Sequence, residues 1–166
     1  MKILVCVSVV PDTTTKITFT DGNTQFNKTG VQFIINPYDE LALTRALDIT
    51  EPIGGTVTVI TVGEADTEPV IRKALAMGAT DAIRVDANPS DGMYVAAQIA
   101  EQAKSGEYDM ILTGRESIDY NGGQVQGLIA EMLNWPLINV AMELDVTDKK
   151  VTAVRDIDGG RETISV

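Results

Sequence analysis

The chain has 166 residues, of which 44% are hydrophobic and 22% are charged, and this predicts one globular domain, residues 1–166, with its own hydrophobic core. The formal net charge of −11 argues against nucleic acid and anionic membrane surfaces as partners, because both repel an acidic protein. The chain has no histidine and one cysteine, Cys6. It therefore cannot build a serine–histidine triad, an internal disulfide or a thiolate metal cluster by itself.

The first apolar run shows no sign of a membrane or export segment. Met1–Val10 is interrupted by Lys2 and Ser8 and is followed by Pro11, so it is too short to cross a bilayer and lacks the pattern of a signal peptide. We expect a cytoplasmic protein. Cys6 lies inside this run, and its surroundings predict a small buried core residue.

The N-terminal third predicts a buried strand, an antiparallel excursion and then a helix. Lys2–Val7 is apolar and β-branched, as in a buried strand. Thr13–Thr20 and Val31–Ile35 flank the turn dipeptide Asp21–Gly22, which predicts a short antiparallel pair.

Asn36 and Pro37 mark the start of the first helix. Asparagine favours the N-cap position, and proline is favoured at the first helical position, where its missing N–H is not needed. Asp39 and Glu40 then place acids in the first turn, where the helix dipole stabilises them. We expect this helix to end near Thr50.

Strand and helix patterns alternate through most of the remaining chain. Strands are predicted at Val57–Val62, Asp81–Val85, Met110–Thr113 and Ile138–Met142. Helices are predicted at Glu68–Met77, from Asn88-Pro89-Ser90 onward, and at Gln124–Leu133. Val151–Val154 and Arg161–Val166 alternate around Gly159-Gly160 and predict a hairpin.

This order predicts an α/β fold: a mostly parallel open sheet with helices on both faces, Rossmann-like, with an antiparallel edge hairpin. In such a sheet, ligands bind beyond the carboxyl ends of the strands. The loops that follow Val7, Val62 and Thr113 all belong to that edge, and the helix at Asn36 begins near it. The fold pattern alone therefore brings distant segments together at a small-ligand site.

The loop from Gly114 to Val125 is long for a strand-to-helix connection and carries Gly122 and Gly123 just before the helix. Two interpretations fit it. Glycines and free N–H groups at a helix start can hold an anion, with Arg115 assisting; alternatively, the segment is a glycine turn with a solvated Arg115–Glu116 pair. No Walker A motif is present, and no glycine fingerprint follows the first strand.

Six segments resemble the beta subunit of electron transfer flavoproteins, in order and in spacing. They are Ile3–Val7, Ile35–Glu40, Arg72–Ala79, Gly114–Asp119, Asn134–Pro136 and Asp156–Gly160. The resemblance implies an electron-carrier subunit, not an enzyme, in which flavin carries the redox chemistry. It implies a heterodimer with an alpha subunit that serves flavin dehydrogenases. It also implies an adenine nucleotide in the pocket, either AMP or a second FAD.

The same resemblance assigns the pocket residues. They are Cys6, Asn36, Pro37, Tyr38, Asp39, Val62, Gly114, Arg115, Glu116, Ser117, Ile118, Asp119, Tyr120, Asn121, Gly122, Gly123, Gln124 and Val125. These residues fall at the strand ends that sheet geometry selects independently. Backbone groups of Gly122 to Val125 are expected to hold phosphate, and Cys6, Asn36 and Val62 to line the nucleoside.

The chain departs from the family pattern in two respects. AMP-binding members often have Asn-Gln-Thr where this chain has Gly123-Gln124-Val125, and flavin-binding members often have Asp and Thr where it has Asn121 and Gly122. The choice between AMP and FAD therefore stays open. Family members also continue past Val166, so the chain is expected to lack their C-terminal segment.

Two other functions compete with this one. A stand-alone ATP- or AMP-binding regulatory module, similar to universal stress proteins, would share the pocket but needs a late glycine-spaced phosphate motif. A nucleotide-dependent ligase or pyrophosphatase domain needs a Ser-Gly-Gly loop after the first strand, where this chain has Ser8-Val9-Val10-Pro11. The identity of the bound ligand separates the three.

Overall fold

The computed structural model describes residues 1–147 and 150–166. A parallel sheet forms its centre, with the strand order β7-β6-β1-β8. These strands are β1 (Lys2–Cys6), β6 (Thr56–Val62), β7 (Asp81–Val85) and β8 (Met110–Leu112). Because β6 and β7 lie on one side of β1 and β8 lies on the other, the strand order reverses between β1 and β8. Such a switch point opens a crevice at the carboxyl edge of a sheet.

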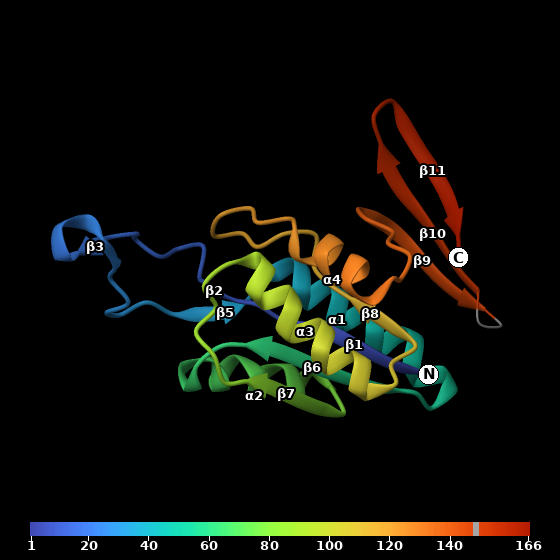
Figure 1. Ribbon diagram of the computed structural model, residues 1–166, viewed down its shortest axis with the longest axis horizontal. Helices are drawn as coiled ribbons and strands as arrows, with labels where there is room; N and C mark the ends of the chain where they lie inside the picture. Colours follow the sequence, from blue (N-terminus) through green and yellow to red (C-terminus); the bar gives the residue numbers. More distant parts are fainter. Residues whose placement is uncertain (148–149) are drawn as a thin grey trace.

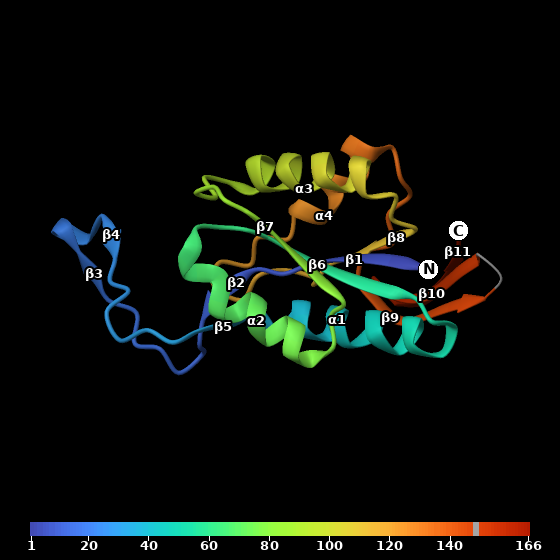
Figure 2. The same cartoon turned by 90° about the horizontal axis from the view of Figure 1, so that it is seen from below.

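Helices cover both faces of this sheet, as the sequence predicts. They are α1 (Pro37–Thr50), α2 (Glu68–Met77), α3 (Gly92–Gly106) and α4 (Val125–Leu133). Figure 2 shows α1 and α2 on one face and α3 and α4 on the other. Short 3₁₀ turns at Glu51–Ile53 and Ala65–Thr67 join α1 to β6 and β6 to α2. No helix in residues 1–147 and 150–166 is long and apolar enough to cross a membrane.

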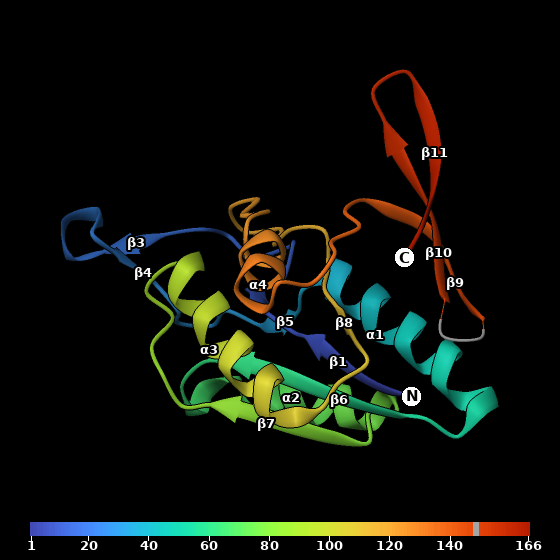
Figure 3. The ribbon, with the colours of Figure 1, turned by 45° about the vertical axis from the view of Figure 1, so that its right-hand side comes forward.

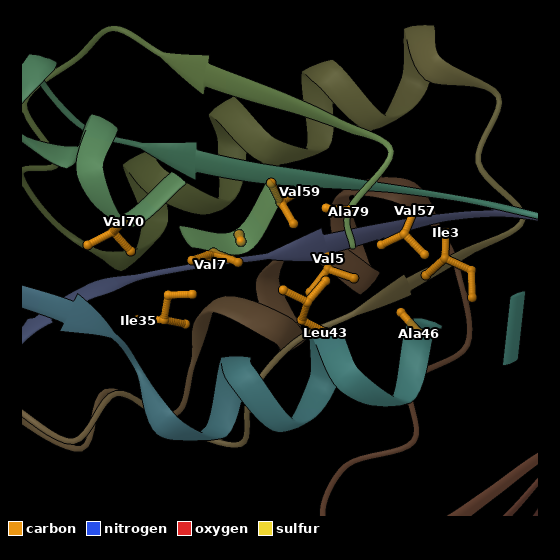
Figure 4. Close-up of a cluster of buried hydrophobic side chains, with 11 residues drawn as sticks. Ile3, Val5, Val7, Ile35, Leu43, Ala46, Val57, Val59, Val70 and Ala79 are labelled. Carbon is orange, nitrogen blue, oxygen red and sulfur yellow. The ribbon is translucent and has the colours of Figure 1, made fainter. Parts of the chain in front are cut away.

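Alternation along β1 builds a core on each face, because successive strand side chains point to opposite sides. Ile3, Val5 and Val7 pack against α1 and α2 in one cluster (Figure 4), whereas Leu4 and Cys6 pack against α3 and α4 in the other. Cys6 is therefore the buried core residue that the sequence predicts.

The antiparallel excursion after β1 forms, but its strands pair differently from the prediction: Thr13–Thr20 is a strand only at Phe19–Thr20, and the predicted partner, Val31–Ile35, contributes Phe33–Ile35 to a pair with Val9–Pro11 instead. β2 (Val9–Pro11) pairs with β5 (Phe33–Ile35), and β3 (Phe19–Thr20) pairs with β4 (Gln25–Phe26) around a 3₁₀ turn at Asp21–Asn23. Figure 1 shows that β3 and β4 form an arm that projects from the body of the molecule.

The predicted C-terminal hairpin forms from β10 (Lys150–Ile157) and β11 (Gly160–Ser165), and β9 (Ala141–Thr147) extends it to an antiparallel sheet of three strands separate from the parallel one. Figures 1 and 3 show this sheet extending away from the helices. The strand predicted at Ile138–Met142 lies too early in the chain. Val140 has φ 53°, a left-handed conformation that a strand cannot contain.

One helix start and one helix cap differ from the prediction. α3 begins at Gly92 and not at Asn88–Ser90, because the Asp91 carboxylate caps it by accepting the Tyr94 N–H at 2.8 Å. α1 begins at Pro37 as predicted, but the Asn36 side chain makes no capping hydrogen bond. That side chain contacts a distant loop instead.

Candidate functional site

A cavity of about 650 Å³ opens at the carboxyl edge of the parallel sheet. Four connections meet around it: the segments after β1, β6, β7 and β8, together with the start of α1. A volume of this size suits a small organic ligand or cofactor. The predicted convergence of distant strand ends is therefore what the fold produces.

Most of the predicted site residues line this cavity. Those that do are Cys6, Asn36, Asp39, Val62, Gly114, Glu116, Ser117, Asp119, Tyr120, Gly122, Gln124 and Val125. Those that are not among the lining residues are Pro37, Tyr38, Arg115, Ile118, Asn121 and Gly123. The structure gives several of the second group internal roles: the Arg115 guanidinium lies 3.8 Å from Glu116 Oε1, and the Gly123 N–H donates to Asn121 O at 3.0 Å.

Three further segments line the cavity: Ser8–Val10 after β1, Gly63, Glu64, Asp66 and Thr67 after β6, and Asn88–Gly92 after β7. The sequence places the first two loops at this edge without naming their residues as part of the site, and it misses the third. The third could have been found, because the predicted strand Asp81–Val85 ends at the same edge as the others. The segment between β4 and β5 also contributes Lys28, which pairs with Asp66 at 3.2 Å. No local pattern predicts that contact across 38 residues.

Asp39, in the first turn of α1, connects the segments on the two sides of the switch point. Its Oδ2 accepts the Ser8 N–H at 2.8 Å and the Ser8 hydroxyl at 2.5 Å, and its Oδ1 accepts the Gly114 N–H at 2.9 Å. Asn36 adds a parallel connection: its Nδ2 donates to Glu116 O at 2.9 Å, and its Oδ1 accepts the Ile118 N–H at 3.2 Å. Both side chains belong to buried residues.

Burial has the largest influence on the protonation of two titratable groups of the cavity, Asp39 and Cys6. Burial raises the pKa of Asp39 above its ordinary value, although the hydrogen bonds from Ser8 and Gly114 lower it. Burial, with a smaller contribution from the Asp39 carboxylate, raises the pKa of the Cys6 thiol far above its ordinary value. Cys6 is therefore a neutral thiol, suited to contact an apolar surface and not to act as a nucleophile.

The start of α4 forms the opposite wall and has free backbone donors. The Leu128 N–H donates to Gln124 O at 3.1 Å, which begins the helical ladder. Within the described residues, no acceptor bonds the N–H groups of Gln124, Val125, Gln126 or Gly127. Gln126 Nε2 instead holds the preceding loop, by donating to Arg115 O at 3.0 Å and to Gly123 O at 2.9 Å. These free amides and the helix dipole form an anion-binding end.

The other helix starts around the cavity offer less to an anion. At α3, the Asp91 carboxylate already takes the Tyr94 N–H. At α1, Pro37 has no N–H, and the amides of Asp39 and Glu40 both donate to Asn36 O. At α2, Pro69 also lacks an N–H, and Glu68 places an acid in the first turn.

Ser117, in the loop before α4, is a lining residue of the cavity whose hydroxyl makes no hydrogen bond within the described part of the chain. Its Oγ is buried, and no hydrogen-bond partner for it exists among residues 1–147 and 150–166. A buried hydroxyl without a partner costs free energy, so a ligand oxygen that bonds this hydroxyl would be stabilised by it.

The cavity is acidic. The carboxylates among its lining residues are Asp39, Glu64, Asp66, Asp91, Glu116 and Asp119. Lys28 is the one lysine or arginine among the described lining residues. No group of three or more potential metal ligands gathers in the described part of the chain. An anionic ligand therefore depends on backbone donors, and each added negative charge makes binding harder.

The sequence also matches a known protein family. The electron transfer flavoprotein domain family matches residues 23–166. The chain is 35% identical over 168 residues to "Electron transfer flavoprotein subunit beta" of Bacillus subtilis, covering 99% of the chain and 65% of that protein. It is 31% identical over 170 residues to the human protein of the same name, covering 99% of the chain and 67% of that protein.

A plant relative gives a similar result. "Electron transfer flavoprotein subunit beta, mitochondrial" of Oryza sativa subsp. japonica is 34% identical over 172 residues, covering 100% of the chain and 68% of that protein. The chain thus spans about two thirds of the length of the relatives it matches.

Proposed function

The chain belongs to the electron transfer flavoprotein family, as a homologue of its beta subunits, and from that premise we propose that it is an electron-carrier subunit that holds AMP or a second FAD at the carboxyl edge of its parallel sheet. In such a carrier the redox chemistry is supplied by flavin, and the protein supplies position and electrostatics. We further propose an alpha subunit as its partner, with flavin dehydrogenases served through that complex, and a cytoplasmic location.

One observation supports a phosphate-bearing ligand: of the four helices that begin around the cavity, α4 begins with the longest run of amides without an acceptor in the described residues, and Ser117, whose hydroxyl has no partner there, lines the same cavity. Phosphate is the ligand group that such a helix start binds best. The α4 amides and Ser117 Oγ would hold it.

The rest of the cavity suits the nucleoside. Apolar side chains from both sheet and helices line its inner part: Cys6, Ile60, Val62, Val95 and Ile99. A purine ring buries apolar faces, so this lining fits it. The acidic character of the cavity favours a ligand with one phosphate over one with three. This weighs against the stand-alone ATP-binding module.

The first experiment identifies the ligand. The purified chain is denatured, and the released material is analysed by absorption spectroscopy and mass spectrometry, before and after co-expression with an alpha subunit. AMP supports the simple carrier, FAD supports a subunit with its own flavin, and ATP supports the regulatory module. An absence of any adenine nucleotide in both preparations would contradict the proposal.

The second experiment tests the α4 wall with AMP as the probe. Gln124→Glu places a carboxylate at the start of α4, where it stabilises the helix but repels phosphate. We expect weaker AMP binding by calorimetry without lower thermal stability. Gln102→Glu, on α3 and outside the cavity lining, adds the same charge as a control. Equal effects of the two variants would show that the phosphate lies elsewhere.

A further inference from the structure

We propose that Asn36 and Asp39 are positioning residues: they form a brace from the start of α1 that fixes the loop between β8 and α4 in its nucleotide-binding conformation. The inference rests on the proposed function for its ligand. It assigns the two side chains a role different from that of the α4 amides, although both sets border one cavity.

The polar atoms of the brace are already engaged. Asn36 is 1% exposed and Asp39 is 6% exposed. Both oxygens of the Asp39 carboxylate accept N–H groups of the protein, from Ser8 and Gly114, and the Asn36 amide uses both its oxygen and its nitrogen on the β8–α4 loop. A nucleotide that took these atoms would have to break buried hydrogen bonds.

A continuous chain of hydrogen bonds runs from the brace, through the β8–α4 loop, to the start of α4. Asn36 and Asp39 hold three successive parts of the loop, at Gly114, Glu116 and Ile118. Gln126, on α4 beyond the other end of the loop, donates from its side chain to Arg115 O near the start of the loop. The position of the free α4 amides relative to the sheet is thus defined through the loop that the brace orders.

Gly114 shows how closely the loop is seated on α1. A Cβ at this position would lie 2.2 Å from Asp39 Oδ1 and 2.8 Å from both Asp39 N and Tyr38 C. Only glycine therefore lets the loop reach the carboxylate. At Gly123, in contrast, the nearest atom to a Cβ would be 3.6 Å away, so the close fit belongs to the brace and not to the whole loop.

The apparent affinity for the nucleotide depends on the fraction of molecules in which this loop has its binding conformation. If the loop adopts its binding conformation only a tenth of the time, the apparent dissociation constant for the nucleotide rises about tenfold, with no change in any contact to the ligand. Loss of the brace should therefore weaken binding even though the α4 amides and Ser117 Oγ, which are proposed to hold the phosphate, are all retained.

The test measures AMP affinity by calorimetry and amide hydrogen exchange in the full chain, for the native protein, Asp39→Ala and Asp39→Asn. For Asp39→Ala we expect about tenfold weaker binding and faster exchange at Gly114 and Ile118, while the β1 amides stay protected. Asp39→Asn keeps one oxygen for the Gly114 N–H and should recover part of the affinity. Glu40→Gln, on the same turn but paired with Lys73 at the surface, should match the native protein.

Several outcomes would overturn the brace. They are unchanged AMP affinity in Asp39→Ala, unchanged exchange at Gly114 and Ile118, or equal losses in the alanine and asparagine variants, which would indicate an effect of charge alone. Should Asp39→Ala fail to fold, Ser8→Ala removes one hydrogen bond to Asp39 and is judged by the same criteria. If the native chain binds neither AMP nor FAD, the proposed function fails, and the exchange data still decide whether the brace orders the loop.

Discussion

Two walls of the cavity are built from the same element, the start of a helix, and yet they differ in what they leave free. At the α1 wall, Asn36 and Asp39 use their hydrogen bonds on the protein. At the α4 wall, the amides from Gln124 to Gly127 have no acceptor within the described residues. A helix start is therefore a ligand site only where the protein has left its donors unused. The first wall fixes the shape of the cavity, and the second is free to bind.

The largest expected difference between the two walls is in the stability lost when a glycine of each is replaced by alanine. Gly114→Ala forces a methyl group to within 2.2 Å of Asp39 Oδ1 and against the α1 backbone, and we expect a loss of about 3 kcal/mol or more in the free energy of unfolding. Gly123→Ala meets no atom closer than 3.6 Å and should cost little. Urea denaturation of both variants measures the difference. Equal losses at the two positions would mean that the α1 wall is no tighter than the α4 wall.

Asn36→Ala should give the next largest effect. It leaves Glu116 O and the Ile118 N–H buried without their partner, which costs about 1–3 kcal/mol of stability. Asn27, whose Oδ1 accepts the Thr29 N–H at an exposed position, provides the control variant Asn27→Ala. Urea denaturation measures both variants. If Asn36→Ala lost less free energy of unfolding than Asn27→Ala, the structural role that we assign to Asn36 would be wrong.

Asp91→Ala should have a smaller effect and of a different kind. It removes the cap of α3 and should cost about 1 kcal/mol of stability. It also takes a carboxylate from the cavity lining, so AMP affinity should not fall. Asp158→Ala, in the turn between β10 and β11, changes the net charge equally. A fall in AMP affinity specific to Asp91→Ala would show that Asp91 itself contacts the ligand.

Much of this arrangement could be predicted from local patterns. Buried strands, Asn36-Pro37 before a helix and glycines before another helix are short-range signals. Since parallel strands share one carboxyl edge, these signals also place the cavity. The start of α3 is predicted too early, because Pro89 is a weaker signal for the first turn than the side-chain cap at Asp91.

The division of labour between the two walls could not be predicted. Asp39 and Gly114 are 75 residues apart, and Asn36 and Ile118 are 82 apart. Whether an asparagine or a carboxylate at a helix start binds a ligand or another part of the protein depends on what tertiary structure brings to it. The sequence shows the donors and acceptors but not their partners. The residues at the starts of α1 and α4 are therefore both predicted to bind the nucleotide.

The stability of the folded chain should depend on pH through Asp39, the buried carboxyl group of the α1 wall. Because burial raises the pKa of Asp39, the folded chain binds a proton there more readily than the unfolded chain does. The contribution of Asp39 to stability is therefore fully present below its unfolded pKa of about 3.9 and is lost as the pH rises through its folded pKa. Relative to Asp39→Asn, which does not titrate, the native chain should gain stability as the pH falls from about 7 to about 4. A constant difference between the two would contradict the raised pKa.

The smallest expected effect concerns Cys6, where the two walls meet the sheet. Its residue is 8% exposed, and burial holds the pKa of its thiol far above the ordinary value. Since the thiolate is the reactive form, we expect iodoacetamide to modify the folded chain very slowly at about pH 8 and the urea-unfolded chain rapidly. Saturating AMP should slow the modification further, because Cys6 lines the cavity. Rapid labelling of the folded chain, unaffected by AMP, would mean that the cavity floor opens to solvent, and both walls would then have to move more freely than their hydrogen bonds allow.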